Sequence, residues 1–144
     1  MLELLDKFRE LGLILRPEIN QNPIWLCSCC GDCCANLRMV KQFPHPVEYF
    51  SSNYYAEVNP ELFTGCETCV NRCQMKALTI ENTHSHVNLD LCIGCGNCVA
   101  TCENGAIHSK KKEKEIVPPK KSGCYVPKNY DEEKGPWRKF KNDR

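Results

Sequence analysis

The pattern of apolar and polar residues predicts short helices and strands separated by turns. At the start of the chain, Leu5, Phe8 and Leu11 recur at helical spacing, with charged residues between them. This spacing predicts an amphipathic helix over residues 2–11, which Gly12 is expected to end.

Prolines divide the segments that follow. Residues 17–26 contain two prolines and are expected to form an extended connector. A second helix is predicted over residues 35–42, because the sequence Pro44-His45-Pro46 after it cannot continue a helix. Five cysteines lie between the connector and this helix.

Residues 58–107 contain an internal repeat, in which matching residues are 29 positions apart. Each copy predicts a strand, a cysteine-bearing loop and a short helix that leads to another strand. Residues 78–80 and 86–88 flank a polar turn and form the predicted central hairpin. The matches pair Val58 with Val87, Asn59 with Asn88, Leu62 with Leu91, Gly65 with Gly94, Cys66 with Cys95, Cys69 with Cys98, Val70 with Val99, Cys73 with Cys102, and Ala77 with Ala106.

The cysteine content is high, with 13 cysteines in 144 residues. In a secreted protein this content would indicate a disulfide scaffold. However, residues 1–15 carry charges that interrupt any signal-peptide segment, and no run approaches the roughly 18 apolar residues of a membrane span. The thiols are therefore expected to be reduced and metal-bound, in the cytoplasm of an anaerobe.

The charge is distributed unevenly along the chain. Residues 1–109 have 7 Lys and Arg against 12 Asp and Glu, whereas residues 110–144 have 12 against 6. The basic tail is predicted to be largely irregular and to become ordered only against a surface. Its lysines and spaced aromatics are typical of single-strand nucleic-acid binding, but docking on an acidic redox partner, or on the protein's own acidic part, is the simpler interpretation. Cys124 in this tail is expected to be a free surface thiol.

The clearest chemical motif is Cys92-Ile-Gly-Cys95-Gly-Asn-Cys98-Val-Ala-Thr-Cys102. Its C-x₂-C-x₂-C-x₃-C spacing is typical of iron–sulfur cluster loops, and the repeat that contains it resembles the bacterial-type two-cluster ferredoxins. The glycines inside the motif let the backbone approach inorganic sulfide and donate N–H hydrogen bonds to it. The resemblance implies an α+β, ferredoxin-like dicluster fold over residues 54–109, with two short hairpins and two short helices about a pseudo-twofold axis. Residues 1–53 would form an N-terminal helix with a cysteine-rich segment, and residues 110–144 the tail.

In that fold the fourth cysteine of each motif serves the other cluster. The resemblance therefore implies one [4Fe–4S] cluster on Cys73, Cys92, Cys95 and Cys98. A second cluster would be held by Cys66, Cys69 and Cys102, but the residue aligned with Cys92 is Phe63, which cannot bind iron.

Four outcomes are open for the site that has Phe63. A cysteine from residues 27–34 supplies the missing thiolate; or one iron stays open to water, an exogenous ligand or substrate; or a three-iron cluster forms on three thiolates; or the site is empty or partly filled. A change of Phe63 to Cys should separate these outcomes.

The segment Cys27-Ser-Cys-Cys-Gly-Asp-Cys-Cys34 is a further candidate metal site. Adjacent cysteines seldom bind one tetrahedral metal together, because their side chains diverge. The five thiols could nonetheless hold a further iron–sulfur cluster, supply one ligand to the Phe63 site, or bind zinc at the usable C-x₂-C-x₂-C spacing. An unmetallated set of buried thiols is the remaining alternative. The candidate residues are Cys27, Cys29, Cys30, Cys33 and Cys34.

A wider resemblance covers residues 1 to about 120. Asn22-Pro-Ile-Trp-Leu-Cys27 and the segments Tyr55-Ala-Glu-Val58 and Thr64-Gly-Cys66 resemble the C-terminal half of a longer iron–sulfur protein family of anaerobes. The chain departs from that family at two positions, since Phe63 and Asp32 stand where the family tends to have Cys.

These features predict an electron-transfer protein, or a subunit of a larger complex, that passes electrons between bound clusters and a partner oxidoreductase. No nucleotide loop, flavin motif or catalytic triad is visible in the sequence, which favours a carrier over a self-contained enzyme. The alternative is a small reductase or redox sensor that uses an open iron at the Phe63 position. The four histidines are expected to face solvent; they are His45, His84, His86 and His108.

Overall fold

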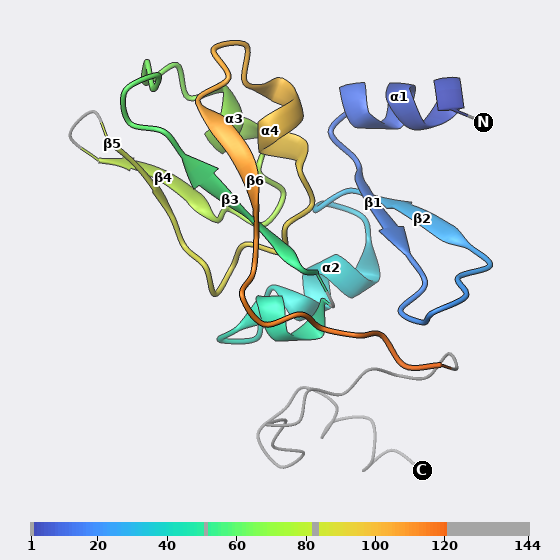
Figure 1. Ribbon diagram of the computed structural model, residues 1–144. Coiled ribbons are helices and arrows are strands. Elements are labelled where there is room, and N and C mark those ends of the chain that lie inside the picture. Colours follow the sequence, from blue (N-terminus) through green and yellow to red (C-terminus); the bar gives the residue numbers. More distant parts are fainter. Residues whose placement is uncertain (1, 51, 82–83, 121–144) are drawn as a thin grey trace.

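The computed structural model describes residues 2–50, 52–81 and 84–120. Its short helices and strands form three two-stranded antiparallel sheets, which pair β1 with β2, β3 with β6, and β4 with β5 (Figure 1). This is the α+β architecture expected from the sequence. In chain order the elements are α1 (Leu2–Glu10), β1 (Ile14–Pro17), β2 (Leu26–Cys29), α2 (Ala35–Val40), the 3₁₀ helix η1 (Pro46–Tyr49), β3 (Tyr54–Val58), α3 (Thr68–Arg72), β4 (Leu78–Glu81), β5 (His84–Val87), α4 (Asn97–Thr101) and β6 (Ile107–Lys111).

The helices predicted over residues 2–11 and 35–42 are confirmed, each to within two residues. The central hairpin is confirmed as well, since β4 and β5 pair with Leu78 opposite Val87. The extended connector expected over residues 17–26 is instead the loop of an additional hairpin, made by β1 and β2.

This loop is closed by side-chain hydrogen bonds in addition to the backbone bond from the Glu18 N–H to the Trp25 carbonyl at 3.2 Å. The buried carboxylate of Glu18 accepts a hydrogen bond from the backbone N–H of Ile24 at 3.3 Å. The side-chain oxygen of Asn20 accepts another from the N–H of Asn22 at 2.8 Å. Because these bonds satisfy donors inside the loop, the chain reverses there despite its two prolines.

The two copies of the repeat fold alike. The order β3, α3, β4 is repeated by β5, α4, β6, and the connections exchange equivalent hydrogen bonds. Asn59 N–H donates to the Ala106 carbonyl at 2.7 Å, and Asn88 N–H donates to the Ala77 carbonyl at 2.8 Å. The two copies therefore share their order of elements and these matching hydrogen bonds. The strand pairing differs from the expected two hairpins in one respect. Only β4 and β5 form a hairpin within the repeat, whereas β3 pairs with β6, which lies at the other end of the repeat.

Backbone conformation follows the same offset of 29 residues. Glu67 and Lys76 are the non-glycine residues with positive φ, at 60° and 54°, within the described part of the chain. Their counterparts in the second copy are Gly96 and Gly105, with φ of 78° and 63°. Both copies therefore turn at the same places, and the second copy uses glycine where the first accepts a strained residue.

Two apolar cores meet between the copies and the N-terminal segment. The first core joins residues of β1, β2 and α2 to Met75 and Ile93 of the repeat, and the second core lies within the repeat. Cys73 packs against both cores. The N-terminal segment is thus part of the structure that supports the cysteine loops.

Residues after β6 return to the N-terminal half of the molecule. Asn53 exchanges two hydrogen bonds with the backbone of Ile116, at 2.7 and 3.0 Å. Gln21 binds the carbonyls of Pro118 and Pro119. The tail expected from residue 110 therefore begins as the end of β6 and is held by these bonds as far as Pro119; its remainder from residue 121, with Cys124, lies outside the described residues. Among the described helices, none has the length and apolar composition needed to cross a membrane.

Candidate metal centres

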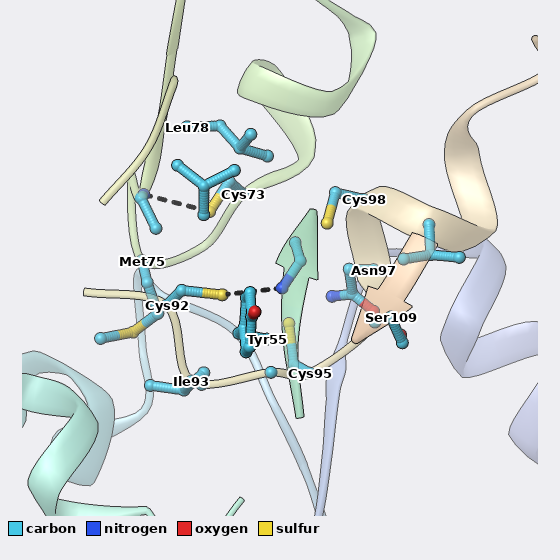
Figure 2. A pocket seen from close by; sticks show the side chains of 16 residues that line it. Tyr55, Cys73, Met75, Leu78, Cys92, Ile93, Cys95, Asn97, Cys98 and Ser109 are labelled. Carbon is cyan, nitrogen blue, oxygen red and sulfur yellow. Dashed lines mark hydrogen bonds between the residues drawn. The ribbon is translucent and has the colours of Figure 1, made fainter. Parts of the chain in front are cut away.

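Four cysteines of the two copies surround one cavity. Three come from the loop before α4 and its first turn, and the fourth directly follows α3. They line about 460 Å³ of empty space, part of it open to solvent, and Figure 2 shows their sulfur atoms turned toward that space. We call this group the first site; its members are Cys73, Cys92, Cys95 and Cys98.

Backbone N–H groups point at two of these sulfurs. The N–H of Ala77 donates to Cys73 Sγ at 3.2 Å, and the N–H of Ala56 donates to Cys92 Sγ at 3.5 Å (Figure 2). Such bonds favour the thiolate form and tune a metal bound to it. The bond to Cys92 comes from β3 and the bond to Cys73 from the segment before β4, so both donors belong to the first copy of the repeat.

The electrostatics of the first site suit a multi-iron cluster. Burial first, and then the nearby sulfurs of Cys95, Cys73 and Cys92, together raise the pKa of the Cys98 thiol to about 12. Four thiolates so close together repel one another unless a cationic metal group lies between them. The donor set, its burial and its N–H bonds therefore fit a [4Fe–4S] cluster.

Gly94 holds the loop of the first site against β3. Its φ is 65°. A Cβ at this position would overlap the Tyr54 carbonyl oxygen and the Ser52 hydroxyl. Glycine is therefore required both for the left-handed turn and for the close approach.

Three cysteines form a second site. Burial raises the pKa of the Cys69 thiol, and the neighbouring sulfurs of Cys66 and Cys102 raise it further. Cys66 is exposed, and its pKa is lowered, first by the hydroxyl of Thr68, which donates to its Sγ at 3.4 Å. The structure thus brings Cys102 to the first motif and Cys73 to the second, which is the exchange that the resemblance implied.

Phe63 lines a separate hollow between the end of β3 and the start of β5. The empty space there is about 760 Å³, including open solvent. Its lining contains no cysteine among the described residues. Ser85 Oγ is buried and has no hydrogen-bond partner in the described part of the chain. We call this hollow the Phe63 corner; it is lined by Val58, Pro60, Phe63, His84 and Ser85.

The cysteines of residues 27–34 form nested pairs. Cys30 Sγ lies 2.7 Å from Cys33 Sγ in the exposed turn before α2. Further in, the side chains of Cys29 and Cys34 are hydrogen-bonded to each other. Cys27 is exposed on β2. The side chains of adjacent cysteines therefore diverge, as expected. Each of them lies near a cysteine on the other side of the turn.

This turn is attached near the first site. The N–H of Gly31 donates to the side-chain oxygen of Gln74 at 2.8 Å, and Gln74 directly follows Cys73. Within residues 2–50, 52–81 and 84–120, no three His, Cys, Asp or Glu side chains lie close enough together to hold a single metal ion, and this includes the cysteines of the first and second sites. The zinc interpretation of residues 27–34 stays a prediction.

The histidines are exposed, as expected. His45 lies 3.4 Å from Asp90, and His108 lies 2.9 Å from Glu57. His84 also borders the Phe63 corner. Sequence reasoning did not identify Ser85. The repeat could have indicated it, because Ser85 aligns with Ala56, which lies beside the first site.

The comparison with known families agrees with this geometry. Residues 64–124 match the family model of the 4Fe-4S dicluster domain. The matched residues include every cysteine of the first and second sites, and they form a 4Fe-4S ferredoxin-type domain. No curated protein matches the chain. The wider resemblance to a family of anaerobes stays a prediction.

Proposed function

We propose that the protein is an electron-transfer protein that passes electrons between its bound clusters and a partner oxidoreductase. The match of residues 64–124 to the 4Fe-4S dicluster domain is the observation that carries this proposal. When bound, a [4Fe–4S] cluster accepts and releases single electrons. The reducing environment that its thiolates need supports a location in the cytoplasm.

The residues of the first site would hold and tune one cluster. Cys73, Cys92, Cys95 and Cys98 supply the thiolates, and the N–H groups of Ala56 and Ala77 stabilise two of them. The surrounding core excludes water from Cys92 and Cys98, which are buried. Low solvent exposure and N–H bonds to sulfur are among the factors that set the reduction potential of such a site.

The second site would face the partner. Cys66 is exposed, whereas Cys69 is buried. A cluster bound through Cys66, Cys69 and Cys102 would therefore reach the surface on the Cys66 side, and we propose that the redox partner docks there. In the basic tail, Lys110 already pairs with Glu57 within the protein, which supports self-docking of that segment over nucleic-acid binding.

Iron and acid-labile sulfide per chain, measured on anaerobically purified protein, test the proposal. Two filled sites give about 8 iron atoms, or about 7 if the second site holds three. The variant Cys98→Ala should lose about 4 of them, because it removes a buried thiolate of the first site. The control Cys27→Ala, on β2, should retain these clusters. Near 4 iron atoms in the native protein would exclude the two-step relay, and an absence of labile sulfide would exclude the function altogether.

A third metal site on residues 27–34 is proposed as well. The nested pairs of Cys29 with Cys34 and of Cys30 with Cys33 gather four sulfurs within one turn. Zinc and iron in excess of the two ferredoxin sites, lost in Cys33→Ser but not in Cys124→Ser, would support it. Metal content unchanged by Cys33→Ser would exclude it.

A second candidate function is a reductase or redox sensor with an open iron at the second site. The Phe63 corner favours it, because a hollow there could admit a small substrate. A substrate-dependent change in the EPR signal of the second site distinguishes this function from a pure relay.

A further inference from the structure

The Phe63 corner is the counterpart of one side of the first site. Both hollows are lined by residues at matching positions of the repeat, and the offset of 29 residues relates each pair. By this correspondence, the Phe63 corner is the side of the repeat on which a fourth ligand of the second site would stand. The pairs are Tyr55 with His84, Ala56 with Ser85, Val87 with Val58, and Cys92 with Phe63.

In the first site, the backbone of β3 contacts Cys92, which is the counterpart of Phe63. The N–H of Ala56 on β3 donates to Cys92 Sγ at 3.5 Å. Ser85 occupies the corresponding position on β5, and its side chain is longer than that of Ala56 by one hydroxyl. Ser85 and Phe63 line the same hollow, so the hydroxyl of Ser85 lies on the side of the repeat where Phe63 replaces a cysteine.

The hydroxyl of Ser85 needs a partner. Ser85 Oγ is buried and accepts or donates no hydrogen bond within the described part of the chain. A buried hydroxyl without a partner destabilises a fold, so such groups in proteins usually have one, and a bound ion is one kind of partner. An iron atom bound beside the Phe63 corner would satisfy this oxygen.

The other protein donors are less well placed. The turn of residues 27–34 is held next to Gln74 by Gly31, on the side of the first site. The side chain of His84 is exposed, whereas Ser85 Oγ faces inward.

We propose that Ser85 Oγ is the fourth protein ligand of the cluster held by Cys66, Cys69 and Cys102. This inference rests on the proposed function, because it requires that the second site is filled. Binding forms one iron–oxygen bond and breaks the O–H bond of the serine. The proton leaves to water through the open side of the Phe63 corner, and no electron is transferred in this step.

An oxygen ligand makes the two sites unequal. Oxygen is a harder donor than sulfur and stabilises the more oxidised iron. The second cluster is then harder to reduce than it would be with four thiolates, and electrons would move in a preferred direction between the sites. The first site, with four cysteines, keeps ordinary ligation.

Variants of Ser85 test the proposal by iron analysis and EPR of the anaerobic protein. Ser85→Ala should lose about one of the roughly 8 iron atoms per chain and acquire a three-iron EPR signal. Ser85→Cys should retain all iron, and its two reduction potentials should lie closer together than in the native protein. Thr79→Ala removes an exposed hydroxyl from the adjacent strand β4 and should change neither quantity.

A double substitution isolates the role of the corner. Phe63→Cys restores a thiolate there, so adding Ser85→Ala to that variant should no longer remove iron. A structural role of Ser85 in the hairpin would instead persist in the double variant.

Each contrary result has a separate meaning. Native iron content and spectrum in Ser85→Ala would overturn the proposal and assign the fourth position to water or another ligand. About 7 iron atoms in the native protein, with a three-iron signal, would overturn it as well, because no fourth iron would be bound. Near 4 iron atoms would instead refute the two-cluster relay on which the proposal rests.

Discussion

Gly94 and Gly96 lie in the same loop of the first site and have similar backbone conformations, with φ of 65° and 78°. They differ in what a side chain would meet. A Cβ at Gly94 would overlap the backbone of Tyr54, whereas nothing lies within 4 Å of a Cβ at Gly96. The left-handed conformation alone costs a non-glycine residue about 1–2 kcal/mol, and this cost is common to both positions.

The pair gives a prediction at the scale of one residue. Gly94→Ala should lose about 4 iron atoms per chain, because the loop must move away from β3 and take Cys92 and Cys95 with it. Gly96→Ala should bind iron normally and lower stability by only about 1–2 kcal/mol. Iron analysis and guanidinium unfolding check both expectations. Equal iron content in the two variants would show that the contact with Tyr54 does not position the loop.

At the scale of elements, the pairing of β3 with β6 is reinforced by charged side chains. Glu57 on β3 accepts hydrogen bonds from Lys110 and from His108 on β6. Lys110 and then His108 lower the pKa of Glu57, and Glu57 raises the pKa of Lys110. Both shifts favour the charged pair in the folded state.

The sign of each shift predicts a pH dependence. The contribution of Lys110 is complete below its unfolded pKa, near 10.5, and disappears as the pH rises through the higher folded value. The contribution of Glu57 is present above its unfolded pKa, near 4.5, and disappears as the pH falls through the lower folded value. Glu57→Gln should therefore lower the thermal midpoint slightly at pH 7 and have almost no effect well above pH 10.5.

Glu61→Gln, in the loop after β3, is the matched control for this prediction. The midpoint is followed by the visible absorption of the clusters during heating. The effect is expected to be small, because exposed ion pairs contribute little. A difference between Glu57→Gln and the native protein that is constant from pH 7 to strongly alkaline pH would contradict the assignment.

The elements also show what the sequence could predict. The repeat over residues 58–107 predicted the order of strand, loop, helix and strand in each copy, because both copies carry the same apolar and cysteine positions. It did not predict the hairpin of β1 and β2, whose strands are too short for an alternating pattern and whose loop is closed by the buried Glu18. The strained turns at Glu67 and Lys76 become visible only when the first copy is compared with the glycines of the second.

The candidate sites were predictable to a similar degree. The resemblance to two-cluster ferredoxins, carried over by the repeat, implied that Cys73 lies with the second motif. The repeat also aligned Phe63 with Cys92 and so indicated a site that lacks one thiolate. The pairing of Cys30 with Cys33 was not predictable, because it depends on the turn that Gln74 holds. Within the described part of the chain, Ser85 Oγ is buried without a hydrogen-bond partner. This could not be predicted, because burial depends on tertiary packing and not on the local sequence.

At the scale of the whole molecule, the N-terminal segment supports the first site. Met75 and Ile93 come from the repeat, next to Cys73 and Cys92, but they belong to the core that β1, β2 and α2 complete. Asn97, which precedes Cys98, donates to the Gly12 carbonyl at 2.8 Å. The second site has no member in that core among the described residues.

This arrangement predicts that damage to the N-terminal core affects the two sites differently. Leu37 on α2 is only 1% exposed, and Leu37→Ala should lower stability by about 2–5 kcal/mol through the cavity it leaves. Because Met75 and Ile93 pack against this core, the first site should lose its iron at a lower temperature than in the native protein, while the second site changes less. Leu62→Ala, at a residue that is 48% exposed, is the control. The two sites are followed separately by EPR after stepwise heating, and simultaneous loss of both signals in Leu37→Ala would mean that the molecule unfolds as one unit.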